Sequence, residues 1–210
     1  TRYDDVTGVQ TCALPILDPN AEGVERRTYP TIDGAKGCDV ILNNVKVGAD
    51  ALLGEEGKAA DVIEYQTGRA IAALCAEAVG CMEEANELTL EYLKQRKQFG
   101  VPIGKFQVLQ HRMVDMMSEL EQARSMAILA ASVADDEQSD ERRRTLAAAK
   151  NVINRAGQFI SEKGIQSHGG IGMTWEYSFA HYAKRLVMIG HQLGDDDFHL
   201  ERYASLLQAG

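Results

Sequence analysis

The sequence predicts a mainly α-helical protein, in which an antiparallel four-helix bundle over residues 58–210 follows a short β region over residues 17–57. Three observations support this prediction. Apolar residues recur at spacings of three and four through most of residues 58–208, which is the periodicity of amphipathic helices. Glycine-rich or charged breaks separate these patterns by short connections, so neighbouring helices should run antiparallel. Before residue 48, two short runs flank an Asp-Gly turn, which is typical of a β-hairpin.

Residues 1–16 show no usable periodicity, and nothing after them continues their pattern. The run V-T-G-V-Q-T-C-A-L-P-I at 6–16 resembles the conceptual translation of a sequencing adapter, and T-R-Y at 1–3 fits its upstream part. A signal peptide is the alternative, but the apolar core is short and no basic start precedes it. We therefore expect residues 1–16 to be an artefact that packs poorly, and the native chain to extend further on its amino-terminal side.

The β region is expected to contain two strands. The first covers residues 25–34 and runs into the Asp33-Gly34 turn, and the second covers residues 38–47 with a kink at its Asn pair. A loop follows and ends with L-L-G-E-E-G at 52–57. Because two strands alone bury too little surface to be stable, we expect them to be the end of a larger β domain.

Four long helices of roughly 20 to 35 residues are expected after residue 57, by the length of each apolar stripe. The first pattern covers residues 58–95 and the second residues 106–134. A polar connection over residues 135–144 contains Ser139, which is the expected N-cap of the third helix because acidic residues follow it. The fourth pattern begins at Trp175, and a short last helix covers residues 198–208.

The composition argues against several classes of protein. A net charge of −9 disfavours a general nucleic-acid binder, because neutralising phosphates requires clustered Lys and Arg. No run of about 18 apolar residues is present, so no membrane-spanning helix is expected. The four cysteines lack the spacing of a disulfide framework and are expected to be reduced thiols in a cytoplasmic protein. His168, His191 and His199 lack metal-ligand spacing on one face, so no metal site is expected.

The corner between the first two helices is the most informative stretch. The run R-K-Q-F-G at 96–100 ends the first helical pattern, and G-K-F-Q at 104–107 starts the second. Taken from the residues alone, the basic side chains complement the negative end of the helix dipole, and Gly100 is a left-handed C-cap. A second segment, Q-S-H-G-G-I-G at 166–172, indicates by itself only the end of a helix.

Together these two motifs resemble the flavin-contacting segments of the carboxy-terminal helical domain of acyl-CoA dehydrogenases. The resemblance covers residues 27–208, and it is nearest to small subunits of heteromeric bacterial enzymes typified by pimeloyl-CoA dehydrogenase. It implies that residues 58–210 are a carboxy-terminal, flavin-binding helical domain. It also implies that residues 17–57 are the truncated end of the family's middle β domain.

The resemblance implies FAD as the cofactor. It places Arg96 at the flavin diphosphate of a neighbouring subunit, a role suited to a forked and permanently charged donor. It places Phe99 at the adenine end, and it implies that a glycine pair lets backbone amides approach the dinucleotide. The cofactor-binding residues that it implies are Arg96, Phe99, Phe106, Gln107, Gln166, Gly169 and Gly170.

The catalytic base is the point at which the sequence departs from the family. One branch carries a glutamate in a turn before the last helix, where this chain reads G-H-Q-L-G-D-D-D-F-H at 190–199. Counting back from Arg202 places Asp195 at that position, whereas counting forward from Gln166 places Leu193 there. The other branch has its base early in the first helix, where this chain has Ala70. Asp195 is therefore the candidate base, expected to begin the last helix and to face the same cleft as Gln166 and Gly170. The alternatives are a helix-capping role for the aspartates and a base supplied by a partner subunit.

The function that the resemblance implies is oxidation of an acyl-CoA to a 2,3-enoyl-CoA, with dicarboxylic and medium-chain acyl groups as candidates. It implies an electron acceptor such as electron-transfer flavoprotein, and a homo-oligomer or a hetero-oligomer with a large subunit. Two alternatives stay open: a non-catalytic, interface-forming subunit of the same fold, and a helical scaffold without a ligand.

Overall fold

The computed structural model describes residues 17–55 and 57–208, so the expectation for residues 1–16 lies outside the described residues. The chain divides into two compact units, one up to Thr67 and one from Gly68. The first unit contains a hairpin of antiparallel strands, β1 (Val24–Pro30) and β2 (Lys36–Leu42), in register from Val24↔Leu42 to Pro30↔Lys36. Gly34 has a φ of 86° in the connecting turn, as expected for an Asp-Gly hairpin. The second strand ends at Leu42, earlier than predicted, because Asn44 takes a φ of 51°.

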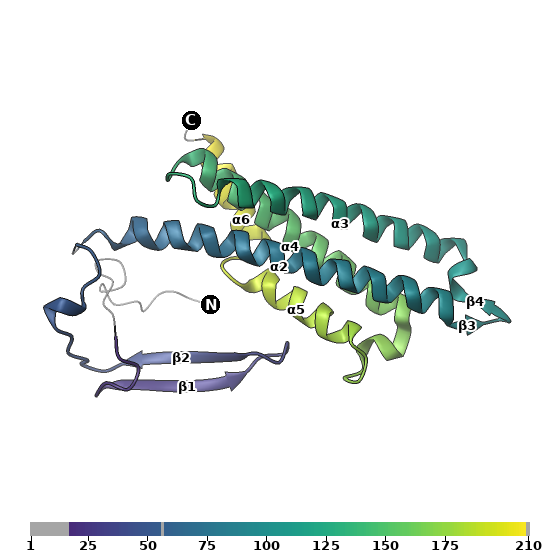
Figure 1. The fold of residues 1–210 in the computed structure, drawn as a ribbon, viewed down its shortest axis with the longest axis horizontal. Coiled ribbons are helices and arrows are strands. Elements are labelled where there is room, and N and C mark those ends of the chain that lie inside the picture. The colour runs from purple at the N-terminus through teal and green to yellow at the C-terminus, as the bar shows by residue number, and fades with distance from the viewer. Residues whose placement is uncertain (1–16, 56, 209–210) are drawn as a thin grey trace. The chain divides into compact units, whose positions relative to one another are not determined.

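Five α-helices follow within the described residues. They are α2 (Ala59–Gln95), α3 (Gln107–Val133), α4 (Asp140–His168), α5 (Phe179–His191) and α6 (Asp196–Gln208). Short 3-10 helices, Ala49–Ala51, Ile103–Lys105 and Gly169–Met173, lie between some of these elements. The predicted bundle is confirmed, since α2, α3 and α4 extend alongside one another in Figure 1 and α4 contacts α3, α5 and α6.

The core of the second unit consists of small and flexible apolar side chains. Alanines at buried positions of α2, α3 and α4 allow close approach of the helix backbones, and Met82 and Met116 are fully buried between them. Ile153 and Ile160 of α4 and Phe179 of α5 complete the centre of this core. The buried stripes follow the predicted spacing, so periodicity was sufficient to identify the core faces.

The predicted N-cap of the third helix is confirmed. The Ser139 hydroxyl accepts a hydrogen bond from the Arg142 amide at 3.1 Å, and Asp140 and Glu141 lie in the first turn of α4. Arg142 itself is buried and caps the preceding helix. Its guanidinium donates to the carbonyl oxygens of Val133 at 3.2 Å and Ala134 at 2.8 Å, at the carboxyl end of α3.

Two predictions about the secondary structure, one on a helix and one on the strands, are wrong in detail. The fourth helix, α5, has 13 residues rather than at least 20, because residues 174–178 form turns and bends, so that α5 begins only at Phe179 rather than at Trp175. Strands were expected only before residue 48, but two further strands of two residues each, β3 (Lys97–Gln98) and β4 (Val101–Pro102), lie between α2 and α3. They form a small hairpin at the end of the bundle (Figure 1).

Candidate functional site

The corner after α2 is a tight β-hairpin rather than a helix cap. Strand β3 pairs with β4, and the two residues between them, Phe99 and Gly100, have φ values of 54° and 80°. Two successive positive φ values are the mark of a type I′ turn, which matches the twist of paired strands. The prediction that Gly100 caps α2 is therefore wrong, because α2 ends at Gln95 and Gly100 belongs to the hairpin turn. Its positive φ was correctly predicted.

The hairpin presents Phe99 to solvent in a strained conformation. The ring is 90% exposed, and a bulky residue with positive φ costs on the order of 1 kcal/mol or more. Its ring meets that of Phe106 edge to face, with centroids 6.1 Å apart and planes at 83°. An exposed aromatic pair on a rigid turn can stack against a planar ligand.

Arg96 links α2 to this hairpin. Its amide still donates to the Tyr92 carbonyl at 2.9 Å, and its own carbonyl accepts from the Ile103 amide at 2.8 Å. The Arg96 side chain is exposed, as is that of Gln107, the first residue of α3. The backbone at Arg96 is thus fixed on both sides, while its charged group is available to a ligand or a neighbouring subunit.

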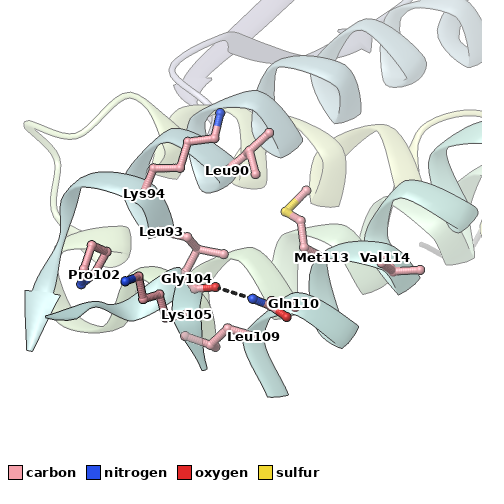
Figure 2. A pocket seen from close by; sticks show the side chains of 10 residues that line it. All are labelled: Leu90, Leu93, Lys94, Pro102, Gly104, Lys105, Leu109, Gln110, Met113 and Val114. Carbon is pink, nitrogen blue, oxygen red and sulfur yellow. Dashed lines mark hydrogen bonds between the residues drawn. The ribbon is translucent and has the colours of Figure 1, made fainter. Parts of the chain in front are cut away.

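A pocket of about 470 Å³ lies behind this corner, between the end of α2 and the start of α3 (Figure 2). Its lining is almost entirely apolar and includes Leu93, Leu109 and Met113. The Gln110 side-chain amide donates to the Gly104 carbonyl at 2.9 Å and fixes the turn at its edge. Gly104 is required here, since a Cβ would lie 2.9 Å from the Leu93 carbonyl oxygen.

The second predicted segment lies at the end of α4. Gly169 ends the helix with a φ of 67°, and its amide donates to the Ile165 carbonyl. Gln166, Gly169 and Gly170 are exposed. A Cβ placed on either glycine would meet nothing within 4 Å, so the backbone of this pair borders open space that a ligand can enter.

His168 fixes the start of this glycine turn. Its Nδ1 donates to the Gly164 carbonyl at 2.8 Å, and its ring lies 4.7 Å from that of Tyr92 and 4.5 Å from that of Phe179, centroid to centroid. Burial lowers the pKa of His168 from its ordinary value, which favours the neutral ring.

The structure brings the two flavin-related motifs to the same end of the bundle. Tyr92 lies one helical turn before Arg96, and His168 directly precedes Gly169, so the Tyr92–His168 contact ties the two motifs together. A permanently charged donor, an exposed aromatic pair and an open glycine backbone are therefore neighbours. These groups fit a dinucleotide: the cation suits a diphosphate, the open glycine backbone allows close approach, and the aromatic rings suit adenine.

Asp195 lies elsewhere in the fold. It precedes α6, where its Oδ1 accepts a hydrogen bond from the Phe198 amide at 2.9 Å, so it acts as the N-cap of the last helix. The next residue, Asp196, is bound through its carbonyl to the Asn151 amide group in the middle of α4. Since α4 rises about 1.5 Å per residue, Asn151 and Gln166 are about 22 Å apart. Asp195 begins the last helix as expected, but this chain does not bring it into one cleft with Gln166 and Gly170.

Sequence reasoning missed a buried polar cluster beside Asp195. Lys150 is fully buried, and its ammonium donates to Asn154 Oδ1 and to the Ile189 carbonyl, both at 2.7 Å. Burial lowers the pKa of Lys150 to about 8. A signal was present: Lys150 lies four residues after Leu146 and three before Ile153, which is a core-facing position. Three alanines directly precede this lysine in the sequence, so the pattern of large apolar residues around it is weak.

Among residues 17–55 and 57–208, no group of three or more His, Cys, Asp or Glu side chains could hold a metal ion. None of the described helices is long and apolar enough to cross a bilayer. The described cysteines, Cys38, Cys75 and Cys81, are free thiols.

Comparisons with known proteins agree with the resemblance. Residues 60–206 match the family described as "Acyl-CoA dehydrogenase, C-terminal domain". Acyl-CoA dehydrogenase IpdE2 of Mycolicibacterium smegmatis is 33% identical over 161 residues, covering 77% of this chain and 47% of the relative. The caffeyl-CoA reductase-Etf complex subunit CarC of Acetobacterium woodii is 30% identical over 181 residues, covering 84% and 47%. The solved butyryl-CoA dehydrogenase of Megasphaera elsdenii has a TM-score of 0.86 at 26% identity, covering 98% of this chain and 54% of that one.

The chain thus spans about half the length of the curated relatives that it matches. The matched range begins near the start of α2, ends two residues before the end of α6, and contains both predicted motifs. Sequence and fold lead to one conclusion: this chain belongs to the acyl-CoA dehydrogenase family, and its residues 60–206 correspond to the carboxy-terminal domain of that family.

Proposed function

We propose that this chain is part of a flavin-dependent acyl-CoA dehydrogenase that oxidises an acyl-CoA to a 2,3-enoyl-CoA. The proteins of this family are FAD-dependent flavoproteins. The observation that carries the proposal is the meeting of Arg96, the Phe99–Phe106 pair and the Gly169–Gly170 backbone at one end of the bundle. These are the groups that the resemblance assigns to FAD, and their exposure in one chain leaves them available to it.

Different residues of this chain would bind FAD and accept the substrate proton. Arg96 would hold the diphosphate, the open backbone at Gly169 and Gly170 would let the dinucleotide approach closely, and Phe99 would contact the adenine. FAD, when bound, supplies the hydride acceptor for the β-carbon of the acyl group. Asp195 is the candidate acceptor of the α-proton, since a carboxylate has a second oxygen besides the one that accepts from the Phe198 amide.

The separation of about 22 Å along α4 between the Asp195 turn and Gln166 favours an oligomer. In such an assembly, Arg96 and Gln166 of one subunit contact a flavin, and the reactive ring of that flavin faces the catalytic base of another subunit. This arrangement agrees with the role that the resemblance assigns to Arg96. A homo-oligomer and a hetero-oligomer with a large subunit both satisfy it, and CarC, named as a subunit of a complex with Etf, supports an electron-transfer flavoprotein as the acceptor.

The candidate substrates are medium-chain acyl-CoAs and acyl-CoAs that end in a second carboxylate, such as pimeloyl-CoA. A non-catalytic, interface-forming subunit is the second candidate function. The capping hydrogen bond of Asp195 favours it, because that bond gives the carboxylate a structural task without any catalysis.

Turnover by the full-length protein tests the proposal. The purified protein is assayed with a panel of acyl-CoAs and an artificial electron acceptor, both alone and together with the large subunit of the proposed hetero-oligomer. The turnover of the Asp195→Asn variant is measured in the same way. Flavin absorbance together with turnover that Asp195→Asn abolishes supports the first function. Flavin absorbance with turnover that Asp195→Asn leaves unchanged supports the non-catalytic role of this chain, and a colourless, inactive protein refutes both.

A further inference from the structure

We propose that Lys150 is a positioning residue, which acts through the turn between α5 and α6 to hold Asp195 in place for proton transfer. This inference rests on the proposed function, because it takes Asp195 as the base. It adds a buried residue of α4 whose ammonium binds Asn154 and the backbone beside Asp195.

Lys150 belongs to a group of three α4 side chains that bind the backbone of this turn. The Lys150 ammonium donates to the Ile189 carbonyl at 2.7 Å and to the Gly194 carbonyl at 3.4 Å. Asn154 donates to the Gly190 carbonyl at 3.1 Å, and Asn151 donates to the Asp196 carbonyl at 2.8 Å. The carbonyls on both sides of Asp195 are therefore fixed to α4 by side chains at positions i, i+1 and i+4 of one helix.

The turn needs such support because its backbone is strained. Leu193 has a φ of 56° and Gly194 a φ of 103°, and a non-glycine residue at positive φ persists only where its surroundings impose it. His199 adds a bond from α6, since its Nε2 donates to the Leu193 carbonyl at 2.9 Å. Gly194 is packed closely as well, since a Cβ there would lie 2.8 Å from His199 Nε2.

The charge of Lys150 is also placed for this task. The carbonyls it binds include that of Ile189 at the carboxyl end of α5, where a cation is favourable. The carboxylates of Asp195 and Asp196 favour its charged form, whereas burial opposes it. Cys75 from α2 and His199 from α6 also face this cluster.

A buried lysine could instead serve only the stability of the bundle. Arg142 offers a direct comparison, because it too is a buried cation on α4 that binds backbone carbonyls, at 3.2 Å and 2.8 Å. Those carbonyls belong to the end of α3, away from the turn that carries Asp195. A variant of Arg142 therefore loses a buried cation without releasing Asp195.

The test uses the flavin-loaded, full-length enzyme with Lys150→Met, Arg142→Met as the matched control, and Asp195→Asn. We expect Lys150→Met to lower kcat about 100-fold, the loss that a misplacement of about 1 Å causes, with KM and flavin content within about twofold. Amide hydrogen exchange over residues 192–197 should become faster in Lys150→Met and stay unchanged in Arg142→Met. If Lys150→Met does not fold, Lys150→Gln, which keeps a donor, replaces it and should show a smaller loss of the same kind.

The double variant separates a role through Asp195 from an independent role. If Lys150 acts through Asp195, then Lys150→Met adds no further loss of kcat in the Asp195→Asn background. Losses that multiply would overturn the inference, as would unchanged exchange over residues 192–197 in Lys150→Met. Full activity of Asp195→Asn would overturn it in a different way, because the base assignment of the proposed function would then fail first.

Discussion

Replacement of Gly164 by alanine should destabilise the bundle although alanine is the better helix former. Gly164 lies inside α4, and a Cβ there would overlap the ring of Phe179, a fully buried side chain that begins α5. Forcing a methyl group into a packed core costs about 1–3 kcal/mol, against a gain of up to about 1 kcal/mol in helix propensity. We expect the free energy of unfolding to fall by about 1–2 kcal/mol, or Tm to fall by about 2–8 °C.

Gly80→Ala is the matched control. Gly80 lies on an exposed face of α2, and a Cβ there would meet no atom within 4 Å. This variant should therefore gain about 0.5–1 kcal/mol from the loss of glycine flexibility alone. Urea unfolding of the two variants beside the unchanged protein measures both effects. Equal changes in the two variants would refute the packing of Phe179 against Gly164.

Three more predictions follow from the described contacts. Phe99→Asn should raise the free energy of unfolding by about 1 kcal/mol, because Asn-Gly suits a type I′ turn, yet it should weaken FAD binding. Thermal melting measures the stability and FAD titration the affinity. A lower free energy of unfolding would contradict the assignment of a type I′ turn. Ser139→Ala should cost about 1 kcal/mol through loss of the α4 N-cap, and no shift in the urea midpoint would contradict that cap. Burial lowers the pKa of His199 to about 4 against an ordinary value of 6.5, so the free energy of unfolding should fall as pH falls from 6.5 to 4. His199→Gln should flatten this dependence of stability on pH. An unchanged pH profile in that variant would contradict the burial of a neutral ring.

Hydrophobic periodicity predicted most of the fold. The stripes through Met82, Met116 and Ile153 have helical spacing, and each of these residues is buried. The hairpin at Phe99 could not be predicted in the same way, because strands of two residues carry no periodic signal and the basic residues around them resemble a helix end. The short α5 was missed for a related reason: Trp175 continues the apolar spacing, but it lies in a turn and is 64% exposed.

The candidate site was predicted from resemblance more than from periodicity. Arg96 and Gly169 are far apart in sequence, and only the packing of Tyr92 against His168 shows that they share one end of the bundle. Lys150 could have been noticed as a charge on a core-facing position. Its partners are backbone carbonyls of a turn about 40 residues later, however, and no local pattern predicts such a contact.

We propose that the end of the bundle around Arg96 binds the diphosphate of FAD, and the dissociation constant of FAD from the full-length protein tests this most directly. Arg96→Gln removes charge-assisted hydrogen bonds worth about 1.5–3 kcal/mol, which predicts a Kd about 10- to 150-fold higher. Lys94→Gln is the control, because Lys94 is an exposed cation on the same helix end that pairs with Glu91 at 2.8 Å. The Kd of the control should stay within about twofold of that of the unchanged protein. A Kd for Arg96→Gln that equals the control value would contradict the binding of the FAD diphosphate by Arg96.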